Sequence, residues 1–349
     1  MSGPGNARSE GLSNRDREYL LNDLLRDVSR SFFLTLKLLP GAVRQQIGLA
    51  YLLARATDTI ADTGALSVER RLETLNRLRN AILQGAKERF EVAEIRAHQS
   101  SEGERILLER IGDALTMLAN TEAEDRRLIQ NVLETITSGQ ELDLRRFSNA
   151  TSGSVVALKT AEELDDYTYR VAGCVGEFWT RICVRHLSPG PSVGLESLIE
   201  KGIRFGKGLQ LVNILRDVPA DLRMGRCYLP EERLQAVQMR PEELLNPANE
   251  ERVRPVYDEF LKEAQEHLNV AWSYVLDLPR SWFRVRLACA LPVLIGVKTL
   301  NKLRDGDVLN PDTKIKVSRQ DVKRILRLMV LLYPMNSAWR NLPARVVRA

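Results

Sequence analysis

Apolar residues recur at three- and four-residue spacing along nearly the whole chain of 349 residues, which is the pattern of amphipathic helices. The longest such stretches cover residues 123–147, 160–186, 192–218, 250–277, 281–304 and 318–333. No stretch alternates apolar and polar residues between two hairpin turns, so strands are not expected. No repeat of about 30–45 residues occurs, which disfavours a helical solenoid. We therefore predict an all-α fold of about ten helices in one domain at 15–349, after a frayed polar segment 1–14.

The charge balance is mildly basic, with 51 Lys and Arg residues against 46 Asp and Glu residues and a net charge of +5. This charge suits anionic ligands or an acidic membrane surface, but it is too small to indicate nucleic-acid binding. The four cysteines are scattered without a Cys-x-x-Cys pair, which indicates a reducing compartment.

The N-terminus has no apolar signal core, and the best apolar run, residues 287–297, is shorter than the roughly 18 residues of a membrane span. We expect a cytoplasmic protein, either soluble or peripheral to a membrane.

Two pairs of aspartates carry the most informative spacing in the chain. Asp58 and Asp62 are four residues apart in an apolar helical stretch, and so are Asp217 and Asp221. Such spacing puts each pair on one helix face, one turn apart, where two like charges repel. Pro219 lies inside the second pair and is expected to end or kink the helix, which loosens the argument there.

Two such pairs predict a site for magnesium and diphosphate. Carboxylate oxygens suit Mg²⁺, which completes its shell with water and substrate phosphates. Nearby guanidinium groups, at Arg55, Arg216, Arg223 and Arg226, suit diphosphate oxygens. A single pair of this spacing is better explained by a solvated helix face, but two pairs in apolar helices with arginines nearby favour the metal site.

These residues resemble the squalene/phytoene synthase family, the head-to-head prenyl diphosphate synthases. Five elements occur in the family's order: residues 29–32 (Ser-Arg-Ser-Phe), the first aspartate motif at 51–62, a tyrosine and Val-Ala-Gly segment at 167–176, the second aspartate motif at 210–221, and a Gly-Arg-Cys-Tyr-Leu-Pro loop at 225–230. The resemblance covers the chain from about Ser29 to Val317.

The resemblance implies an isoprenoid synthase class I fold with helices around a central cavity, and a prenyltransferase activity. The implied reaction condenses two farnesyl diphosphates to presqualene diphosphate. Members that make squalene then rearrange and reduce this intermediate with NADPH, whereas members that make phytoene or dehydrosqualene end by losing a proton.

The resemblance also implies roles for individual residues. Asp58, Asp62, Asp217 and Asp221 would hold several Mg²⁺ ions, and the catalytic residues would be Tyr167, Arg55, Asp58 and Asp217. Substrate would be bound by a larger set: Arg30, Ser31, Phe32, Tyr51, Arg55, Val171, Gln210, Asn213 and Arg226. The small residues that follow Tyr167 would either make room for a prenyl chain or permit a close helix crossing.

Three features favour the squalene synthase branch, that is, a farnesyl-diphosphate farnesyltransferase of bacterial type. They are the Asp-Thr form at Asp58, the Cys-Ala-Leu-Pro element at 289–292, and residues 313–317, which resemble a segment implicated in NADPH binding. In that segment, Lys314 and Lys316 would bind the cofactor. The forms at 167–173 and 225–230 are more like those of phytoene synthases.

Beyond residue 318, basic and apolar residues alternate at helical spacing, which indicates either a solvated helix face or peripheral contact with an anionic membrane. Three alternatives to squalene synthesis stay open: a phytoene or dehydrosqualene synthase, a synthase that stops at presqualene diphosphate, and a non-catalytic assembly partner with the same fold. Chain length of the substrate, C15 or C20, and the monomeric or homodimeric state also stay open.

Overall fold

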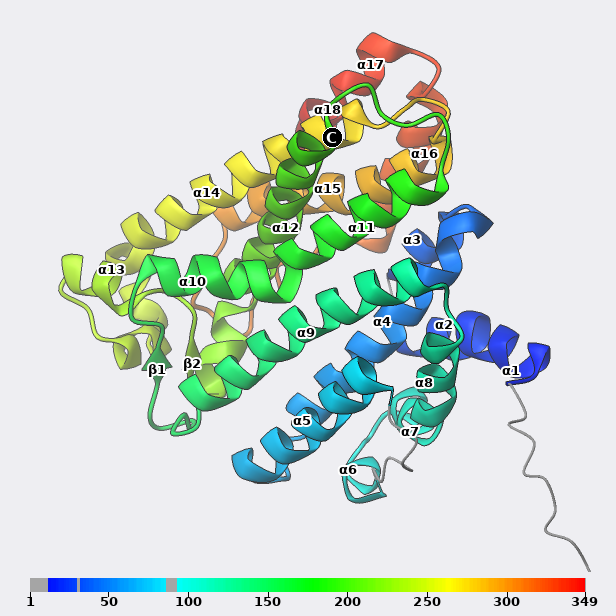
Figure 1. The fold of residues 1–349 in the computed structure, drawn as a ribbon. Coiled ribbons are helices and arrows are strands. Elements are labelled where there is room, and N and C mark those ends of the chain that lie inside the picture. Colours follow the sequence, from blue (N-terminus) through cyan, green and yellow to red (C-terminus); the bar gives the residue numbers. More distant parts are fainter. Residues whose placement is uncertain (1–11, 30–31, 86–92, 349) are drawn as a thin grey trace, which may run out of the picture. The chain divides into compact units, whose positions relative to one another are not determined.

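A computed structural model describes residues 12–29, 32–85 and 93–348, and this part of the chain is almost entirely helical (Figure 1). The α-helices are α1 (Asn14–Glu18), α2 (Leu25–Ser29), α3 (Phe32–Leu38), α4 (Gly41–Ala61), α5 (Val68–Gln84), α6 (Ala93–Ala97), α7 (Glu102–Glu109), α8 (Ile111–Ala119), α9 (Ala123–Arg146), α10 (Ala161–Thr168), α11 (Cys174–His186), α12 (Leu195–Arg223), α13 (Glu231–Ala236), α14 (Glu250–Asp277), α15 (Phe283–Arg304), α16 (Arg319–Leu332), α17 (Asn336–Arg340) and α18 (Leu342–Arg348). Shorter elements are π-helical segments at Tyr19–Leu24 and Tyr169–Gly173, 3₁₀ turns at Pro241–Leu245 and Pro247–Asn249, and strands β1 (Val156–Ala157) and β2 (Arg226–Cys227). The all-α prediction is confirmed.

The structure has more helices than predicted, because several stretches in which apolar residues recur at one continuous helical spacing are divided into separate helices. The stretch at 160–186, for example, forms α10, a π-helical segment and α11. Most of the predicted segment 1–14 lies outside the described residues. No described helix is both long enough and apolar enough to cross a bilayer, and the apolar run at 287–297 lies within the buried part of α15.

The described chain divides into two compact units. The first comprises Met1–Phe33 and Gln45–Leu133, and the second comprises Leu34–Arg44 and Glu134–Ala349. The prediction of one domain over 15–349 is not tested by this division and stays a prediction.

In the first unit, α4 supplies a continuous buried face and α5 packs with defined ends. Ser67 caps α5 by accepting a hydrogen bond from the backbone N–H of Arg70 at 3.3 Å. Gly85 ends the helix in the left-handed conformation at φ 70°, which favours glycine. The fixed ends of α5 support the helix that carries the first aspartate pair.

In the second unit, α12, α14 and α15 pack against one another and form its core. Large side chains such as Tyr257, Tyr274 and Phe260 are fully buried there. Burial of apolar area on this scale is the main favourable term in folding. The second aspartate pair lies on α12 and is therefore carried by one of the three helices that form this core.

The prediction that Pro219 ends the helix before Asp221 is wrong, because α12 continues to Arg223; the alternative, a kink at Pro219, stays a prediction. Proline cannot donate to the carbonyl four residues earlier, which here belongs to Leu215. The buried hydroxyl of Tyr257, on α14, donates to that carbonyl at 3.0 Å instead. Tertiary packing thus supplies the missing donor, and Asp217 and Asp221 remain on one helical segment.

The small residues after Tyr167 permit a close helix crossing. A Cβ added to Gly176 would overlap the carbonyl oxygen of Gly202 on α12, and one added to Gly206 would overlap the carbonyl oxygen of Ala172. The backbones of α11 and α12 therefore approach as closely as glycine allows. Of the two roles expected for these residues, the structure shows helix packing.

Candidate active site

The first aspartate pair lies on a polar stripe of α4. Of residues 51–62, those that are not buried are Tyr51, Ala54, Arg55, Asp58 and Asp62, at the three- and four-residue spacing of one helix face. Asp62 follows the last residue of α4, but its backbone N–H still donates to the carbonyl of Asp58 at 2.9 Å. The structure therefore keeps both carboxylates one turn apart on that stripe.

Arg55 connects this pair to a carboxylate that the sequence analysis did not identify. Its Nη1 donates to Oδ2 of Asp58 at 2.5 Å, and its Nη2 pairs with Glu104 of α7. Burial, followed by repulsion from Asp62, raises the pKa of Asp58 to about 6 although Arg55 opposes this shift. Glu104 lies 49 residues from Arg55 in a segment without a motif, so no spacing pointed to it.

Two predicted substrate residues lie side by side near the start of this stripe. The rings of Phe32 and Tyr51 stack with centroids 5.1 Å apart and an interplanar angle of 24°. Arg30 and Ser31, the other predicted residues of that segment, lie outside the described residues. The two stacked rings form a flat aromatic surface, and Tyr51 is one helical turn before Arg55.

The second aspartate pair lies on α12 together with the predicted substrate residues Gln210 and Asn213. These two and Asp217 and Asp221 follow at three- and four-residue spacing along one continuous helix. Arg216 binds Asp217 with both nitrogens, Nε to Oδ1 at 2.8 Å and Nη2 to Oδ2 at 2.5 Å. This bidentate ion pair fixes the orientation of the Asp217 carboxylate.

Asp221 lies beside a small pocket of mostly apolar side chains. Burial, followed by repulsion from Asp217, raises its pKa to about 7, while Arg226 opposes the shift. The pocket is lined by Ile214, Val218, Asp221, Leu222, Arg226, Cys227, Tyr228 and Leu229. Asp221 is thus a carboxylate whose charge is poorly solvated by its surroundings.

Strand β2 positions Arg226 against this pocket. It pairs in parallel with β1, with Val156 opposite Arg226. Gly225 precedes the strand at φ 77°, and a Cβ there would overlap the backbone of Thr151. Only glycine fits this turn, which explains the glycine that precedes Arg226 at the start of the loop.

Tyr167 heads a chain of polar groups that the sequence analysis identified only at its first member. Its hydroxyl donates to that of Tyr228 at 3.4 Å, and the two rings stack with centroids 4.9 Å apart. The Tyr228 hydroxyl donates to the carboxylate of Asp143, on α9, at 3.0 and 3.2 Å to its two oxygens. Arg226 Nη1 also donates to Asp143, at 3.5 Å. Asp143 is 85 residues from Tyr228, so only the fold brings them together.

Val171, another predicted substrate residue, faces α9. A Cβ added to Gly139 would lie 3.2 Å from Cγ1 of Val171. Val171 is half-buried at this helix contact. Its position shows packing against α9 within the second unit.

The predicted cofactor residues Lys314 and Lys316 lie on the segment between α15 and α16, with both side chains exposed. Lys302 Nζ donates to the carbonyl of Lys316 at 2.9 Å. Exposed ammonium groups suit the phosphates of a dinucleotide.

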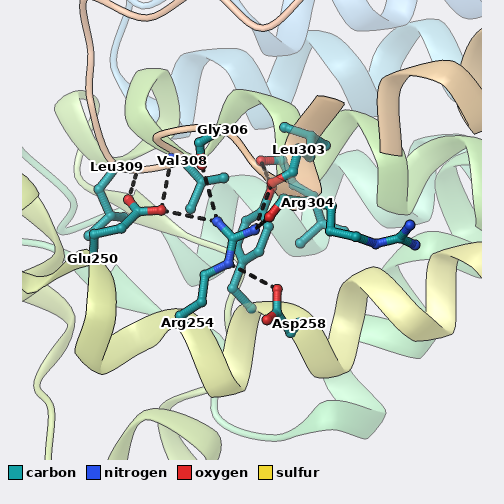
Figure 2. Close-up of polar contacts among 10 residues, drawn as sticks. Glu250, Arg254, Asp258, Leu303, Arg304, Gly306, Val308 and Leu309 are labelled. Carbon is teal, nitrogen blue, oxygen red and sulfur yellow. Dashed lines mark hydrogen bonds and ion pairs between the residues drawn. The ribbon is translucent and has the colours of Figure 1, made fainter. Parts of the chain in front are cut away.

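A pair of residues on α14, Glu250 and Arg254, holds the start of the same segment and is called here the α14 clamp (Figure 2). The Glu250 carboxylate accepts from the backbone N–H groups of Val308 and Leu309 at 3.1 and 2.9 Å. Arg254 donates to the carbonyls of Leu303 at 2.9 Å and Gly306 at 3.1 Å, and to that of Arg304. The clamp therefore satisfies backbone groups at the end of α15 and fixes where the lysine-bearing segment departs.

Both aspartate pairs fit magnesium by the chemistry of their donors. In each pair, repulsion between two carboxylates contributes to the raised pKa of one member. A divalent cation removes this repulsion, and Mg²⁺ is commonly bound by one or two carboxylates together with water and substrate phosphates. Among the residues that the structure describes, no cluster of three or more His, Cys, Asp or Glu side chains could hold a metal ion. Each pair would therefore supply two ligands, with water and phosphate as the others.

Comparison with characterised proteins agrees with this arrangement. Squalene synthase of Rattus norvegicus is 25% identical over 299 residues, covering 84% of this chain and 67% of its own length. Squalene synthase of Schizosaccharomyces pombe is 26% identical, covering 87% of this chain and 63% of its own. A bifunctional lycopene cyclase/phytoene synthase of Gibberella fujikuroi is 27% identical, covering 73% and 42%. The chain thus spans about two thirds or less of these relatives.

Solved structures share the fold. A complex of TcSQS with the ligand E5700 superposes with a TM-score of 0.74 at 21% identity, covering 96% of this chain and 98% of that one. A dehydrosqualene synthase complex superposes with a TM-score of 0.66 at 20% identity, covering 92% and 97%. The sequence profile of squalene/phytoene synthases matches residues 25–321, which is most of the chain. The protein therefore belongs to the squalene/phytoene synthase family, a family of prenyltransferases.

Proposed function

We propose that this protein is a squalene synthase. It condenses two molecules of farnesyl diphosphate to presqualene diphosphate in the presence of Mg²⁺, and then rearranges and reduces this intermediate to squalene with NADPH. The observation that carries the proposal is the Cys-Ala-Leu-Pro element at 289–292, together with the Asp-Thr form at Asp58, since both resemble the squalene synthase branch.

Each aspartate pair binds metal and diphosphate in this proposal. Asp58 and Asp62 on α4, and Asp217 and Asp221 on α12, hold Mg²⁺, which offsets the negative charge of the departing diphosphates. Arg55 and Arg216 orient Asp58 and Asp217 through the ion pairs described above. The raised pKa values of Asp58 and Asp221 support a site that gains from a nearby cation.

The substrate is bound by the residues around these pairs. Arg226, Gln210 and Asn213 contact diphosphate oxygens, together with Arg30 and Ser31. The stacked rings of Phe32 and Tyr51 flank a prenyl chain, and Val171 bounds a second one. Lys314 and Lys316 bind phosphates of NADPH.

Tyr167 moves or holds a proton at its hydroxyl oxygen. The Tyr228 hydroxyl and the Asp143 carboxylate orient Tyr167 through the chain of hydrogen bonds that the structure contains. A tyrosine whose hydroxyl is held in this way can give a proton to a leaving oxygen and take it back. The stacked aromatic rings also stabilise a neighbouring cation by about 0.5–2 kcal/mol.

The second candidate is a phytoene or dehydrosqualene synthase. It is favoured by the phytoene synthase relative, whose identity of 27% is slightly above that of the squalene synthases. In that case the same aspartates and Tyr167 carry out the condensation, and the product forms by loss of a proton without NADPH.

The two candidates are separated by product analysis. The purified protein is incubated with farnesyl diphosphate and Mg²⁺, with and without NADPH, and the hydrocarbon is identified by mass spectrometry. A parallel reaction uses geranylgeranyl diphosphate. Squalene formed only with NADPH supports the proposal. Dehydrosqualene, a C40 hydrocarbon, or presqualene diphosphate as the end product with NADPH present contradicts it.

A further inference from the structure

The end of the second unit carries an exposed apolar cluster, which we call the α16 tip and define as Phe283, Val330, Leu331 and Met335. These side chains are 38%, 54%, 69% and 52% exposed, whereas most large apolar residues of the described chain are buried. Tyr333 connects them, because it lies between Leu331 and Met335 in sequence and its ring meets that of Phe283 at 4.6 Å. At this end α16 packs on α15, and the red helix α17 follows α16 (Figure 1).

The helix α16 divides its apolar residues between the core and solvent. Ile325 and Met329 are buried, and α16 packs on α15. Val330 and Leu331 lie on the opposite face. The exposed basic residues Arg327 and Lys323 lie in line with them, one and two turns earlier. The free face of the helix thus runs from a basic part to an apolar tip.

The net charge of the chain is concentrated in this region. Residues 319–349 contain seven Lys and Arg residues and one acidic residue, Asp321, so their net charge of +6 exceeds the +5 of the whole chain. Asp321 is used internally, because it caps α16 with Ser318 and pairs with Lys298 at 3.2 Å. No carboxylate of this segment therefore remains to balance the basic face.

We propose that the α16 tip docks on an anionic lipid bilayer, with Val330, Leu331, Met335 and Phe283 inserted at the interface and Lys323 and Arg327 over the acidic headgroups. Exposed apolar residues beside a basic helical face are the features of interfacial helices. Each basic residue near an acidic bilayer adds to the electrostatic attraction, which makes an acidic surface the favoured occupant over a neutral one. The proposal does not depend on which hydrocarbon the protein makes.

The test is co-sedimentation of the full chain with vesicles of phosphatidylcholine containing phosphatidylglycerol, and with vesicles of phosphatidylcholine alone. We expect binding to the acidic vesicles that weakens as sodium chloride is raised. The double variant V330N/L331N and the double variant K323E/R327E should each bind at least about tenfold more weakly. The matched control L195N/L245N changes exposed leucines outside the tip, which are 39% and 40% exposed, and should bind normally.

Several outcomes overturn the proposal. It fails if the protein binds neither vesicle, if it binds both equally, or if the control loses as much binding as the tip variants. Sedimentation without lipid shows whether the tip instead joins two copies of the chain, since a dimer lost in V330N/L331N would assign the surface to a second copy. Prenyltransferase activity is measured separately in detergent-free buffer, so an active protein that ignores lipid refutes this inference and leaves the proposed function standing.

Discussion

At the scale of single residues, Tyr228 connects the predicted catalytic tyrosine to a carboxylate. Replacing Tyr228 by Phe keeps the ring stack with Tyr167 but removes the hydroxyl that donates to Asp143. We expect Y228F to lower kcat about tenfold with little change in KM, and Y167F to lower it by about 10²-fold or more. Steady-state consumption of farnesyl diphosphate measures both.

The control for that experiment is Y274F. It removes another buried tyrosine hydroxyl, which is hydrogen-bonded to Thr180 at 3.0 Å and lies in the helix core. If Y274F lowers kcat as much as Y228F, the effect of Tyr228 is one of general stability. Wild-type kcat in both Y167F and Y228F would contradict the proposed role of the Tyr167–Tyr228–Asp143 hydrogen bonds in proton transfer.

At the scale of elements, the continuity of α12 through Pro219 depends on Tyr257. Its hydroxyl gives the Leu215 carbonyl the donor that proline lacks. We expect Y257F to lower the free energy of unfolding by about 1–3 kcal/mol, because the carbonyl is left unsatisfied in the core. Adding P219A should recover a large part of this loss, since alanine restores a helical N–H. The free energy of unfolding of the wild type and the variants is measured by urea denaturation. Equal losses in Y257F and Y257F/P219A would contradict this account.

The α14 clamp is a second link between elements. Removing the Arg254 guanidinium frees the carbonyls of Leu303, Arg304 and Gly306 at the end of α15. We expect R254M to accelerate amide hydrogen exchange in residues 305–317 about tenfold or more, because hydrogen bonds of charged groups contribute about 1.5–3 kcal/mol.

The matched variant for the clamp is R252M on the same helix. Arg252 donates to Glu243 at 3.0 Å and to the carbonyl of Gln238 at 2.9 Å, so it holds a different loop. Unchanged exchange at 305–317 in R254M, or the same acceleration in both variants, would show that the clamp does not fix this segment.

Much of this helical framework follows from sequence period alone. The stretches predicted at 250–277 and 281–304 end within two residues of α14 and α15, because a long apolar stripe at helical spacing leaves little choice of structure. Pro219 was misjudged because its compensating donor, Tyr257, is 42 residues from Leu215. Glu104 and Asp143 were missed for the same reason, since partners distant in sequence leave no spacing to detect. The roles of the aspartates rested on their spacing and on the resemblance, and they stay predictions.

At the scale of the whole molecule, the four aspartates belong to two compact units, with Asp58 and Asp62 in the first and Asp217 and Asp221 in the second. Each pair offers two carboxylates. In the proposed reaction both diphosphates take part in one condensation, so we expect both pairs to contribute to the same step. Residues that act as a unit give losses that do not multiply.

The variants D58N, D217N and D58N/D217N test this dependence. We expect each single variant to lower kcat by about 10²-fold or more, and the double variant to be little worse than either. The measurement is kcat at saturating Mg²⁺ and farnesyl diphosphate, with D23N as the control, since Asp23 pairs with Arg26 on an exposed surface in the same unit as Asp58. If the two single losses multiply in the double variant, the pairs serve separate steps. Both substitutions keep the size of the side chain and remove its charge. A loss of kcat in these variants is therefore an effect of charge and not of packing.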